Sequence, residues 1–204
     1  MLGVYNYTVL LTYIGMLTGL AGIGCAMGGR IPWALLCLLL AGLCDMFDGK
    51  IASTKKDRTP QEKRFGVQID SLSDLICFGV LPAVTVYAAA RGALYAALAY
   101  VLAALIRLAW FNVDEEERQD TDNGQREMYL GLPVTTAALF LPTVLGLARL
   151  LHGPLPILGT ALLVVMALAF LSPFKLAKPR LPGMILMILM GCAELVIVFL
   201  GVKP

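Results

Sequence analysis

Seven apolar runs, each close to the length that crosses a lipid bilayer, fill most of this 204-residue chain. A hydrocarbon core of about 30 Å needs roughly 20 consecutive apolar residues in a helix. Because backbone polar groups in lipid must be satisfied within each segment, such runs predict helices. We therefore expect an all-α, polytopic transmembrane helical bundle of about six to seven spans, which forms a single domain over residues 1–204. The runs cover approximately residues 8–28, 32–49, 67–90, 92–113, 131–151, 155–171 and 183–202.

The composition excludes an ordinary soluble domain. Apolar residues make up 59% of the chain and charged residues 15%, whereas globular domains have about half and about a quarter. No Lys or Arg precedes the first run, so we expect no cleavable signal peptide. The cysteines lie inside apolar runs without a pairing pattern, which favours buried free thiols. They are Cys25, Cys37, Cys44, Cys77 and Cys192.

Positive charges gather at one of the two ends that alternating spans define. The loops of membrane proteins that carry the excess of Lys and Arg face the cytoplasm. We therefore predict an integral protein of the cytoplasmic membrane, with its N-terminus inside and its C-terminus outside. The minor group is Arg30, Arg91, Arg149 and Lys203. The major group is Lys50, Lys55, Lys56, Arg58, Lys63, Arg64, Arg107, Arg118, Arg126, Lys175, Lys178 and Arg180.

Three polar connections interrupt the apolar sequence, and each falls at the positive end. We expect cytoplasmic loops over about 53–65, 114–130 and 172–182. Pro60 argues against one continuous helix through the first loop. The flanking helices should then cover about 32–52 and 66–90. Pro82 lies inside the second of these and should kink it, and Arg91 with Gly92 predicts the break that follows.

Four aspartates are set into this apolar sequence in two helically spaced pairs. Asp45 and Asp48 lie near the end of the second run, and Asp70 and Asp74 near the start of the third. On helices these spacings place each pair on one face. Two antiparallel helices would then present four carboxylates to one another near the cytoplasmic surface. An ionised carboxylate in a membrane segment is costly, so the pairs indicate a functional site.

Four neighbouring carboxylates repel one another unless a cation neutralises them. Mg²⁺ or Mn²⁺ suits carboxylate ligands that are shared with a substrate's phosphates. We expect two such ions at this site. Gly49 and Gly66 flank the pairs and would give a phosphate or nucleotide backbone clearance. Ala52, one turn after Asp48, keeps the same face shallow.

The complete spacing is Asp45-x2-Asp48-Gly49-x2-Ala52, followed by Gly66-x3-Asp70-x3-Asp74. It closely resembles the signature of the CDP-alcohol phosphatidyltransferases, membrane enzymes that move a phosphatidyl group from a CDP-linked lipid to an alcohol. The resemblance implies a transmembrane catalytic domain with a two-metal site on the four aspartates. It further implies a CDP-lipid pocket at the cytoplasmic interface, which includes Asp48, Gly49, Ala52 and Gly66, and Asp74 as the catalytic base.

Residue 53 departs from that signature. The family usually has Arg directly after the Ala, and this chain has Ser53. The nearby cations Lys50, Lys55 and Lys56 are candidates to contact the phosphates instead, and we place Lys50 in the expected CDP-lipid pocket. The stretch from Ala52 to Gly66 is also a few residues longer than is common in the family.

Flanking sequence narrows the choice within the family. The stretches DSLSDLICFGVLPA (70–83), IRLAWFNV (106–113) and YLGLPVTTAALFLP (129–142) resemble those of membrane-embedded bacterial phosphatidylserine synthases. Trp110 stands where that group more often has Arg. The resemblance covers about residues 40–142. It implies CDP-diacylglycerol and L-serine as substrates, CMP as the released product, direct in-line attack without a covalent enzyme intermediate, and a homodimer among membrane lipids, with no nucleic acid as partner.

Several polar residues outside the signature have two readings. Arg107 lies about six residues inside the fourth run, where it either clamps a phosphate or the serine carboxylate, or forms a structural ion pair with an aspartate or snorkels towards the membrane surface. Asn112, Gly131 and Pro133 either line the serine pocket or cap and turn the chain. Glu194 is a lone acid in the last run, and it pairs across a helix interface or faces a dimer partner.

Two rival functions remain open from the sequence. A sister transferase that uses glycerol 3-phosphate or an inositol phosphate would share the whole signature, although a phosphorylated acceptor calls for a denser basic pocket. A divalent-cation transporter would also place aspartates in membrane helices. A transporter should carry its acids near the midplane with access from both sides, whereas these four cluster towards one interface.

Overall fold

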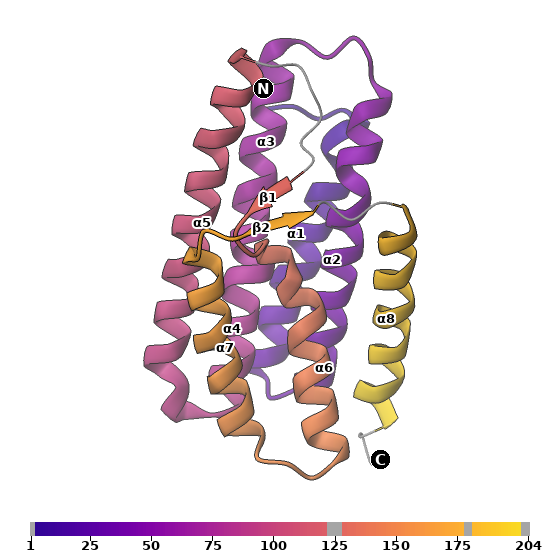
Figure 1. Ribbon diagram of the computed structural model, residues 1–204. Helices are drawn as coiled ribbons and strands as arrows, with labels where there is room; N and C mark the ends of the chain where they lie inside the picture. The colour runs from indigo at the N-terminus through magenta and orange to yellow at the C-terminus, as the bar shows by residue number, and fades with distance from the viewer. Residues whose placement is uncertain (1–2, 122–127, 178–180, 201–204) are drawn as a thin grey trace.

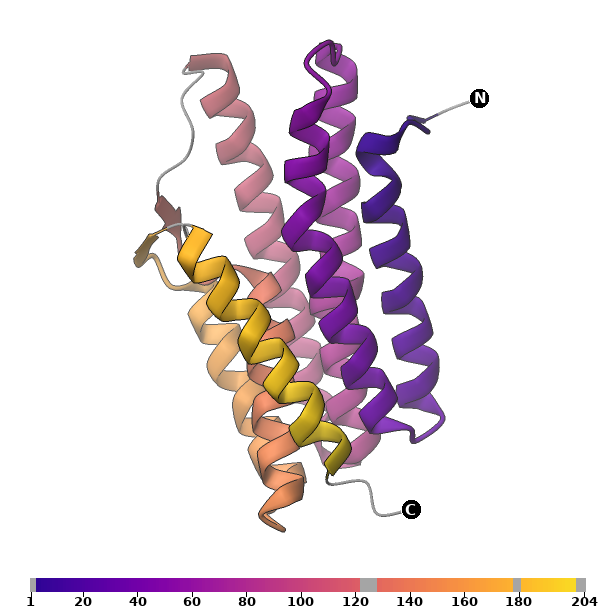
Figure 2. The ribbon, with the colours of Figure 1, turned by 90° about the vertical axis from the view of Figure 1, so that its right-hand side faces the viewer.

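The computed structural model describes residues 3–121, 128–177 and 181–200. Within them the chain forms seven helical rods that run up and down in an elongated bundle (Figures 1 and 2). This confirms the predicted all-α polytopic bundle. The helices are α1 (Tyr7–Met27), α2 (Ile31–Thr54), α3 (Pro60–Asp74), α4 (Leu81–Ala89), α5 (Leu94–Thr121), α6 (Ala137–Leu150), α7 (Leu155–Leu171) and α8 (Leu181–Leu200). Short turns are the π-helix η1 (Leu75–Val80) and the 3₁₀-helices η2 (Arg91–Ala93) and η3 (Val134–Thr136).

Four of the rods are long and apolar enough to cross a membrane. They are Tyr7–Met27, Ile31–Thr54, Pro60–Ala89 and Arg91–Glu117. Three further apolar helices, Val134–Leu150, Leu155–Leu171 and Met187–Phe199, are shorter. The chain is therefore an integral membrane protein. In Figure 2 the first rods extend further than α6, α7 and α8 at the end where α2 meets α3.

Small residues let the rods approach closely around α2. A Cβ atom added at Gly22 in α1 would lie 2.8 Å from Cys37 Cβ in α2 and 2.9 Å from a methyl group of Leu81 in α4. A Cβ atom at Gly42 in α2 would lie 2.7 Å from Ala138 Cβ in α6. Close backbone approach through small residues is typical of membrane helix packing, where apolar lipid gives little hydrophobic drive.

The third rod is continuous from Pro60 to Ala89, but it changes its winding in the middle. Leu81 N–H donates to the carbonyl of Ile76, five residues back, in the π-helical segment. Pro82 has no N–H to offer the carbonyl of Phe78. The hydroxyl of Tyr100 in α5 donates to that carbonyl instead, at 2.6 Å, and Tyr100 is fully buried. The irregularity expected at Pro82 is therefore a π-helical segment, which is supported from the next rod.

Each of the three predicted loops includes residues that belong to a helix or strand in the structure. Ser53 and Thr54 belong to α2, and α3 begins at Pro60 rather than near residue 66, so only residues 55–59 connect the two helices. Pro60 starts the helix instead of breaking it, because its missing N–H is unneeded in the first turn. Thr59 and Glu62 cap this end reciprocally: Glu62 N–H donates to Thr59 Oγ1, and Thr59 N–H donates to Glu62 Oε2.

The other two predicted loops also contain regular structure. The segment from residue 114 to 121 is the end of α5, not a loop. Strands β1 (Met128–Leu130) and β2 (Lys175–Ala177) pair antiparallel and join the second polar connection to the third. This ribbon was not predicted. Residues 122–127 and 178–180, which belong to the expected loops, lie outside the described residues. The break at Arg91 and Gly92 is confirmed, since Ala90 is extended with φ −147°.

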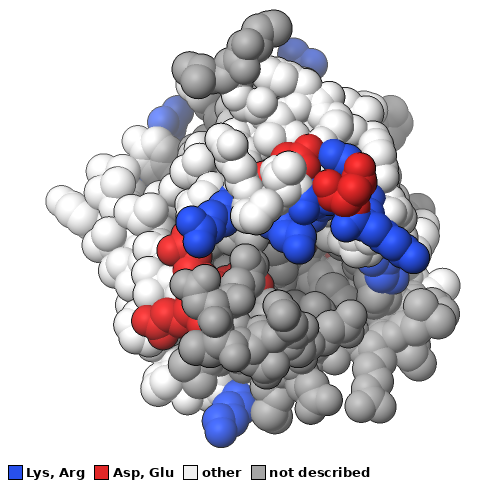
Figure 3. Space-filling model, turned by 90° about the horizontal axis from the view of Figure 1, so that it is seen from above, with Lys and Arg blue, Asp and Glu red and all other residues white. Residues whose placement is uncertain are grey.

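The charged loops lie at one end of the bundle. Asn6 Nδ2, just before α1, donates to Glu62 Oε1 at the start of α3, so the beginning of α1 lies at this end too. Arg91, between α4 and α5, lies at the opposite end, as does the turn between α6 and α7 (Figure 1). Seen from the loop end, Lys and Arg side chains gather beside acidic ones (Figure 3).

Candidate active site

Three of the four aspartates converge between α2 and the third rod. One carboxylate oxygen from each of Asp45, Asp70 and Asp74 lies within 4.8 Å of the other two. Asp45 comes from α2, whereas Asp70 and Asp74 come from consecutive turns of α3. The predicted spacing argument therefore holds in three dimensions. Asp70 and Asp74 are the eleventh and fifteenth residues of α3, so they lie deeper in that helix than a start near residue 66 would place them.

Asp48 is the fourth carboxylate, and α1 holds it in place. Thr12 Oγ1 donates to Asp48 Oδ2 at 2.9 Å, and both side chains are buried. Asp70 and the backbone of Gly49 are further neighbours of this carboxyl group. Thr12 was not singled out in the sequence, because a threonine in an apolar helix usually bonds its own backbone. The contact needs α1 and α2 to pack side by side, which no local pattern predicts.

The donor set fits a hard divalent cation. Mg²⁺ binds oxygen ligands at about 2.1 Å, so two ligands on opposite sides of it are about 4.2 Å apart. The three converging oxygens, within 4.8 Å of one another, need only small side-chain adjustments to reach that geometry. Within the described residues, no Lys or Arg forms a salt bridge of 4 Å or less with these carboxylates. Carboxylates grouped in this way are well suited to hold a metal ion.

Replacing Thr12 by Val should weaken metal binding without removing a ligand. The change leaves Asp48 Oδ2 without its donor, and loss of a partner that orients a ligand typically costs about 10- to 100-fold in metal affinity or activity. We expect the Mn²⁺ concentration for half-maximal activity to rise by about that factor. Thr18→Val in the same helix, where Thr18 Oγ1 donates to the Ile14 carbonyl, is the control. Equal effects of the two variants would contradict the role of Thr12.

The residues expected to approach a nucleotide lie around the aspartates. A Cβ atom at Gly49 would meet no atom within 4 Å, so this exposed position offers the predicted clearance. Gly66 precedes Asp70 by one turn of α3, and a Cβ atom there would lie 2.6 Å from an Arg58 guanidinium nitrogen. Ala52 is half-buried in the last turns of α2. Lys50 is exposed, with its ammonium group 5.8 Å from the centre of the Phe47 ring.

Lys55 is engaged elsewhere. Its ammonium group donates to Glu62 Oε1 at 2.8 Å, and the same oxygen accepts from Asn6 Nδ2. The hydrogen bond with Glu62 raises the pKa of Lys55, because it favours the charged ammonium form. This network ties the α2–α3 connection to the start of α1. It leaves Lys55 less free than Lys50 to contact a substrate phosphate.

The residues expected to line an acceptor pocket separate into two groups. Arg107 is buried in α5, and its Nε would lie 3.4 Å from a Cβ atom at Gly131. Gly131 has φ +79°, and its N–H donates to the Phe174 carbonyl. Pro133 follows, in extended conformation before η3. These residues form a turn that packs against Arg107.

Asn112 lies apart from that turn and faces α3. Its side-chain oxygen accepts from Ser71 Oγ at 2.6 Å, and its amide nitrogen donates to Gln68 Oε1 at 3.3 Å. Gln68 in turn donates to Glu116 at 3.4 Å. Ser71 follows Asp70 directly, so Asn112 helps to fix the turn of α3 that carries this aspartate. Sequence reasoning missed Ser71 and Gln68 as its partners.

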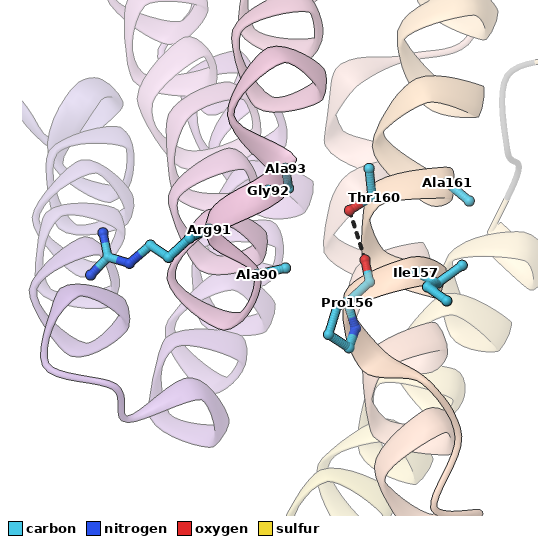
Figure 4. Close-up of a pocket in the computed structure, with 8 residues that line it drawn as sticks. All are labelled: Ala90, Arg91, Gly92, Ala93, Pro156, Ile157, Thr160 and Ala161. Atoms are coloured by element: carbon cyan, nitrogen blue, oxygen red, sulfur yellow. Dashed lines mark hydrogen bonds between the residues drawn. The ribbon is translucent and has the colours of Figure 1, made fainter.

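The buried acidic residue of α8 and a cleft beside α7 lie outside this site. Glu194 in α8 is buried and accepts a hydrogen bond from Thr143 Oγ1 in α6, so it pairs across a helix interface. The five cysteines are free thiols, but the prediction that they are buried holds only for Cys77, and Cys192 is exposed on the helix surface. A cleft of about 640 Å³ lies between Ala90–Ala93 and the start of α7. Arg91 points away from it, and Thr160 bonds the Pro156 carbonyl (Figure 4).

A bundle of apolar helices with a cluster of carboxylates between two of its rods defines a membrane protein with a candidate metal site. The family model of the CDP-alcohol phosphatidyltransferases matches residues 5–188, and the chain belongs to this family of membrane enzymes.

Characterised relatives are similar over large parts of the chain. It is 31% identical over 179 residues to the archaetidylserine synthase of Methanothermobacter thermautotrophicus, which covers 86% of this chain and 70% of the relative. It is 34% identical over 115 residues to the CDP-diacylglycerol–serine O-phosphatidyltransferase of Saccharomyces cerevisiae, covering 54% and 39%. With the enzyme of that name from Mycobacterium leprae the identity is 31% over 144 residues, covering 69% and 45%. The chain thus spans less than half the length of the latter two.

Proposed function

We propose that this chain is a phosphatidylserine synthase, which transfers the phosphatidyl group of CDP-diacylglycerol to the hydroxyl of L-serine and releases CMP. The observation that carries the proposal is the convergence of Asp45, Asp70 and Asp74 in a member of this family. The relatives' names support serine as the acceptor, since the archaeal protein is named an archaetidylserine synthase and the yeast and mycobacterial proteins are named CDP-diacylglycerol–serine O-phosphatidyltransferases.

The reaction is a single displacement at phosphorus. The serine Oγ forms a bond to the phosphorus that carries the diacylglycerol, and the bond from that phosphorus to the bridging oxygen of the pyrophosphate breaks. The bridging oxygen leaves with CMP, and the serine hydroxyl proton passes to a base. No Ser-His-Asp arrangement is formed by the described residues, because His152, the only histidine, lies in the turn between α6 and α7. Direct transfer therefore suits this chain better than a covalent intermediate.

Asp74 is our candidate for the base. It is the deeper of the two aspartates in α3 and is only 9% exposed. A base in contact with the attacking hydroxyl typically contributes 10²- to 10⁴-fold to the rate. Asp45, Asp48 and Asp70 would complete the ligand set, with Asp74 shared between the two roles.

Mg²⁺ or Mn²⁺, as two ions on the four carboxylates, would stabilise the charge that develops on the attacking and leaving oxygens. The chain's own residues would hold these carboxylates in position. Thr12 orients Asp48, and the Ser71–Asn112 bond holds the turn that carries Asp70. Arg107, beside the Gly131 turn, is our candidate to attract the serine carboxylate, and Pro133 belongs to the same turn.

The positive end of the bundle is proposed to face the cytoplasm, in the cytoplasmic membrane. Lys and Arg at that end follow the charge rule for membrane proteins, and both substrates are consistent with this side. We infer that CDP-diacylglycerol enters laterally from the surrounding lipid and L-serine from the water. The assembly is proposed to be a homodimer.

The test is product formation by purified protein in detergent with Mn²⁺ or Mg²⁺. CDP-diacylglycerol is supplied with L-serine, glycerol 3-phosphate or inositol phosphate in parallel, and CMP and the lipid product are measured. Phosphatidylserine that forms only with serine supports the proposal. CMP release with another acceptor would overturn serine as the substrate and keep the family reaction. A CDP-linked ether lipid, as a further donor, tests the likeness to the archaeal relative. Metal uptake into vesicles without CMP release would favour transport.

A further inference from the structure

We propose that Arg58 supplies the cationic contact to the nucleotide phosphate of the donor. The usual Arg after the Ala of the signature, which could make such a contact, is missing from this chain. Ser53 occupies that position, and it is exposed, with its hydroxyl bonded to the Lys50 carbonyl at 2.6 Å. The inference rests on the proposed transfer from a CDP-linked lipid. It concerns a residue outside the shared signature, and the structure places it close to that signature.

The position of Arg58 follows from Gly66. A Cβ atom at Gly66 would lie 2.6 Å from Arg58 Nη2, so the guanidinium group occupies the space in front of this glycine. Residues four apart lie on the same side of a helix, about 6 Å apart along its axis. Gly66, Asp70 and Asp74 are spaced in this way in α3. The guanidinium group therefore lies on the side of α3 that carries both aspartates, about one turn before Asp70.

Arg58 has unused hydrogen-bonding capacity at this place. Its Nη2 donates to the carbonyl of Glu62 at 3.2 Å. Its Nε is buried and has no hydrogen-bond partner among the described residues. A guanidinium group has five N–H donors in a planar fork that matches phosphate oxygens. A half-buried guanidinium group whose Nε has no partner among the described residues, beside a carboxylate site, is suited to an anionic ligand with several oxygens.

The substrate's own polarity decides which part of it Arg58 meets. The acyl chains of the donor stay in the apolar part of the bundle, and the nucleotide points to water. Going from Asp74 to Asp70 to Gly66 leads along α3 towards the charged α2–α3 connection. Arg58 therefore lies on the nucleotide side of the aspartates and would contact the phosphate that leaves with CMP. The other cations of this connection differ, because Lys55 is paired with Glu62 and Lys56 is exposed.

The experiment compares Arg58→Ala, Arg58→Lys and Arg64→Ala. Affinity for CMP in the presence of Mn²⁺ is measured by calorimetry, and KM is measured separately for CDP-diacylglycerol and for serine. We expect Arg58→Ala to weaken CMP binding and to raise the KM for the donor by about tenfold or more, with the KM for serine within about twofold. Lys lacks the planar fork, so Arg58→Lys should restore only part of the loss. Arg64→Ala removes the same side chain from an exposed position of α3 and should change neither quantity.

Gly66→Ala gives an independent second variant. Its methyl group should displace the guanidinium group and weaken CMP binding in the parent chain, but it should add little in the Arg58→Ala chain. Unchanged CMP affinity in Arg58→Ala, or an equal loss in Arg64→Ala, would overturn the proposal. If the parent binds CMP but transfers to another acceptor, serine is wrong and the Arg58 result still stands. A parent that fails to bind CMP overturns both proposals.

Discussion

Replacing Asp74 by Asn is expected to lower the rate of CMP release by at least about a hundredfold, and by up to about 10⁴-fold. The amide has nearly the same shape as the carboxylate, but it cannot accept the serine proton and is a poorer metal ligand. Asp74 lies in the cluster with Asp45 and Asp70 and is itself buried, so little solvent is available to replace it. The rate is measured with saturating serine and donor, because a base contributes to kcat.

Asp57→Asn is the matched control for this variant. Asp57 is exposed in the connection between α2 and α3, so the same chemical change there should leave the rate within about twofold. A thermal unfolding curve shows whether the Asp74 variant is folded. An Asp74→Asn protein that is folded and retains a tenth or more of the parent's rate would remove Asp74 from the role of base.

Removal of divalent metal is expected to abolish transfer completely, and added Mn²⁺ or Mg²⁺ should restore it. The reason is the clustering of carboxylates that no nearby Lys or Arg of the described residues neutralises. Undiminished CMP release in excess chelator would show that the cluster needs no metal for the reaction. Restoration by Ca²⁺ alone would contradict the expected preference for the smaller ions.

Thermal stability gives a readout of the same site without turnover. A ligand that binds only the folded protein raises its midpoint of unfolding, so Mn²⁺ should stabilise the parent. Without metal, like charges in the cluster repel one another, and Asp70→Asn should be at least as stable as the parent. With metal the order should reverse, because the variant has lost a ligand. Leu72, between the two aspartates, is exposed, so Leu72→Ala serves as a control that should show no reversal.

Much of the site could be predicted from the chain because it depends on helical spacing. Intervals of three and four residues place carboxylates on one face, and two antiparallel apolar runs bring two such faces together. Asp45, Asp70 and Asp74 were predicted to meet on this basis, and they do. The start of α3 was misjudged although its signal was present, since Thr59 and Glu62 form a capping box around Pro60.

Other features depend on which rods become neighbours, and local patterns do not contain that information. The bond from Thr12 to Asp48 joins residues 36 positions apart. The bond from Ser71 to Asn112 spans 41 positions. The ribbon of β1 and β2 pairs two segments of three residues each, which are too short to show alternation. The two groups of expected acceptor residues separated for the same reason: Arg107 and Asn112 share α5 but contact different elements.

The wide turn at Leu75–Val80 lets one long rod satisfy two unrelated demands. A regular helix would fix the direction of every side chain after Asp74 relative to the aspartates. The i to i−5 bond at Leu81 instead rotates the half of the rod that follows the turn. Tyr100 stabilises the junction through its hydrogen bond to the Phe78 carbonyl. The half of the rod before this turn can thus aim its carboxylates at α2, while Leu81 and Val86 in the half after it are buried in the core. Substitutions that adapt the half after the turn to a thicker or thinner bilayer can therefore accumulate without changing the direction in which Asp70 and Asp74 point.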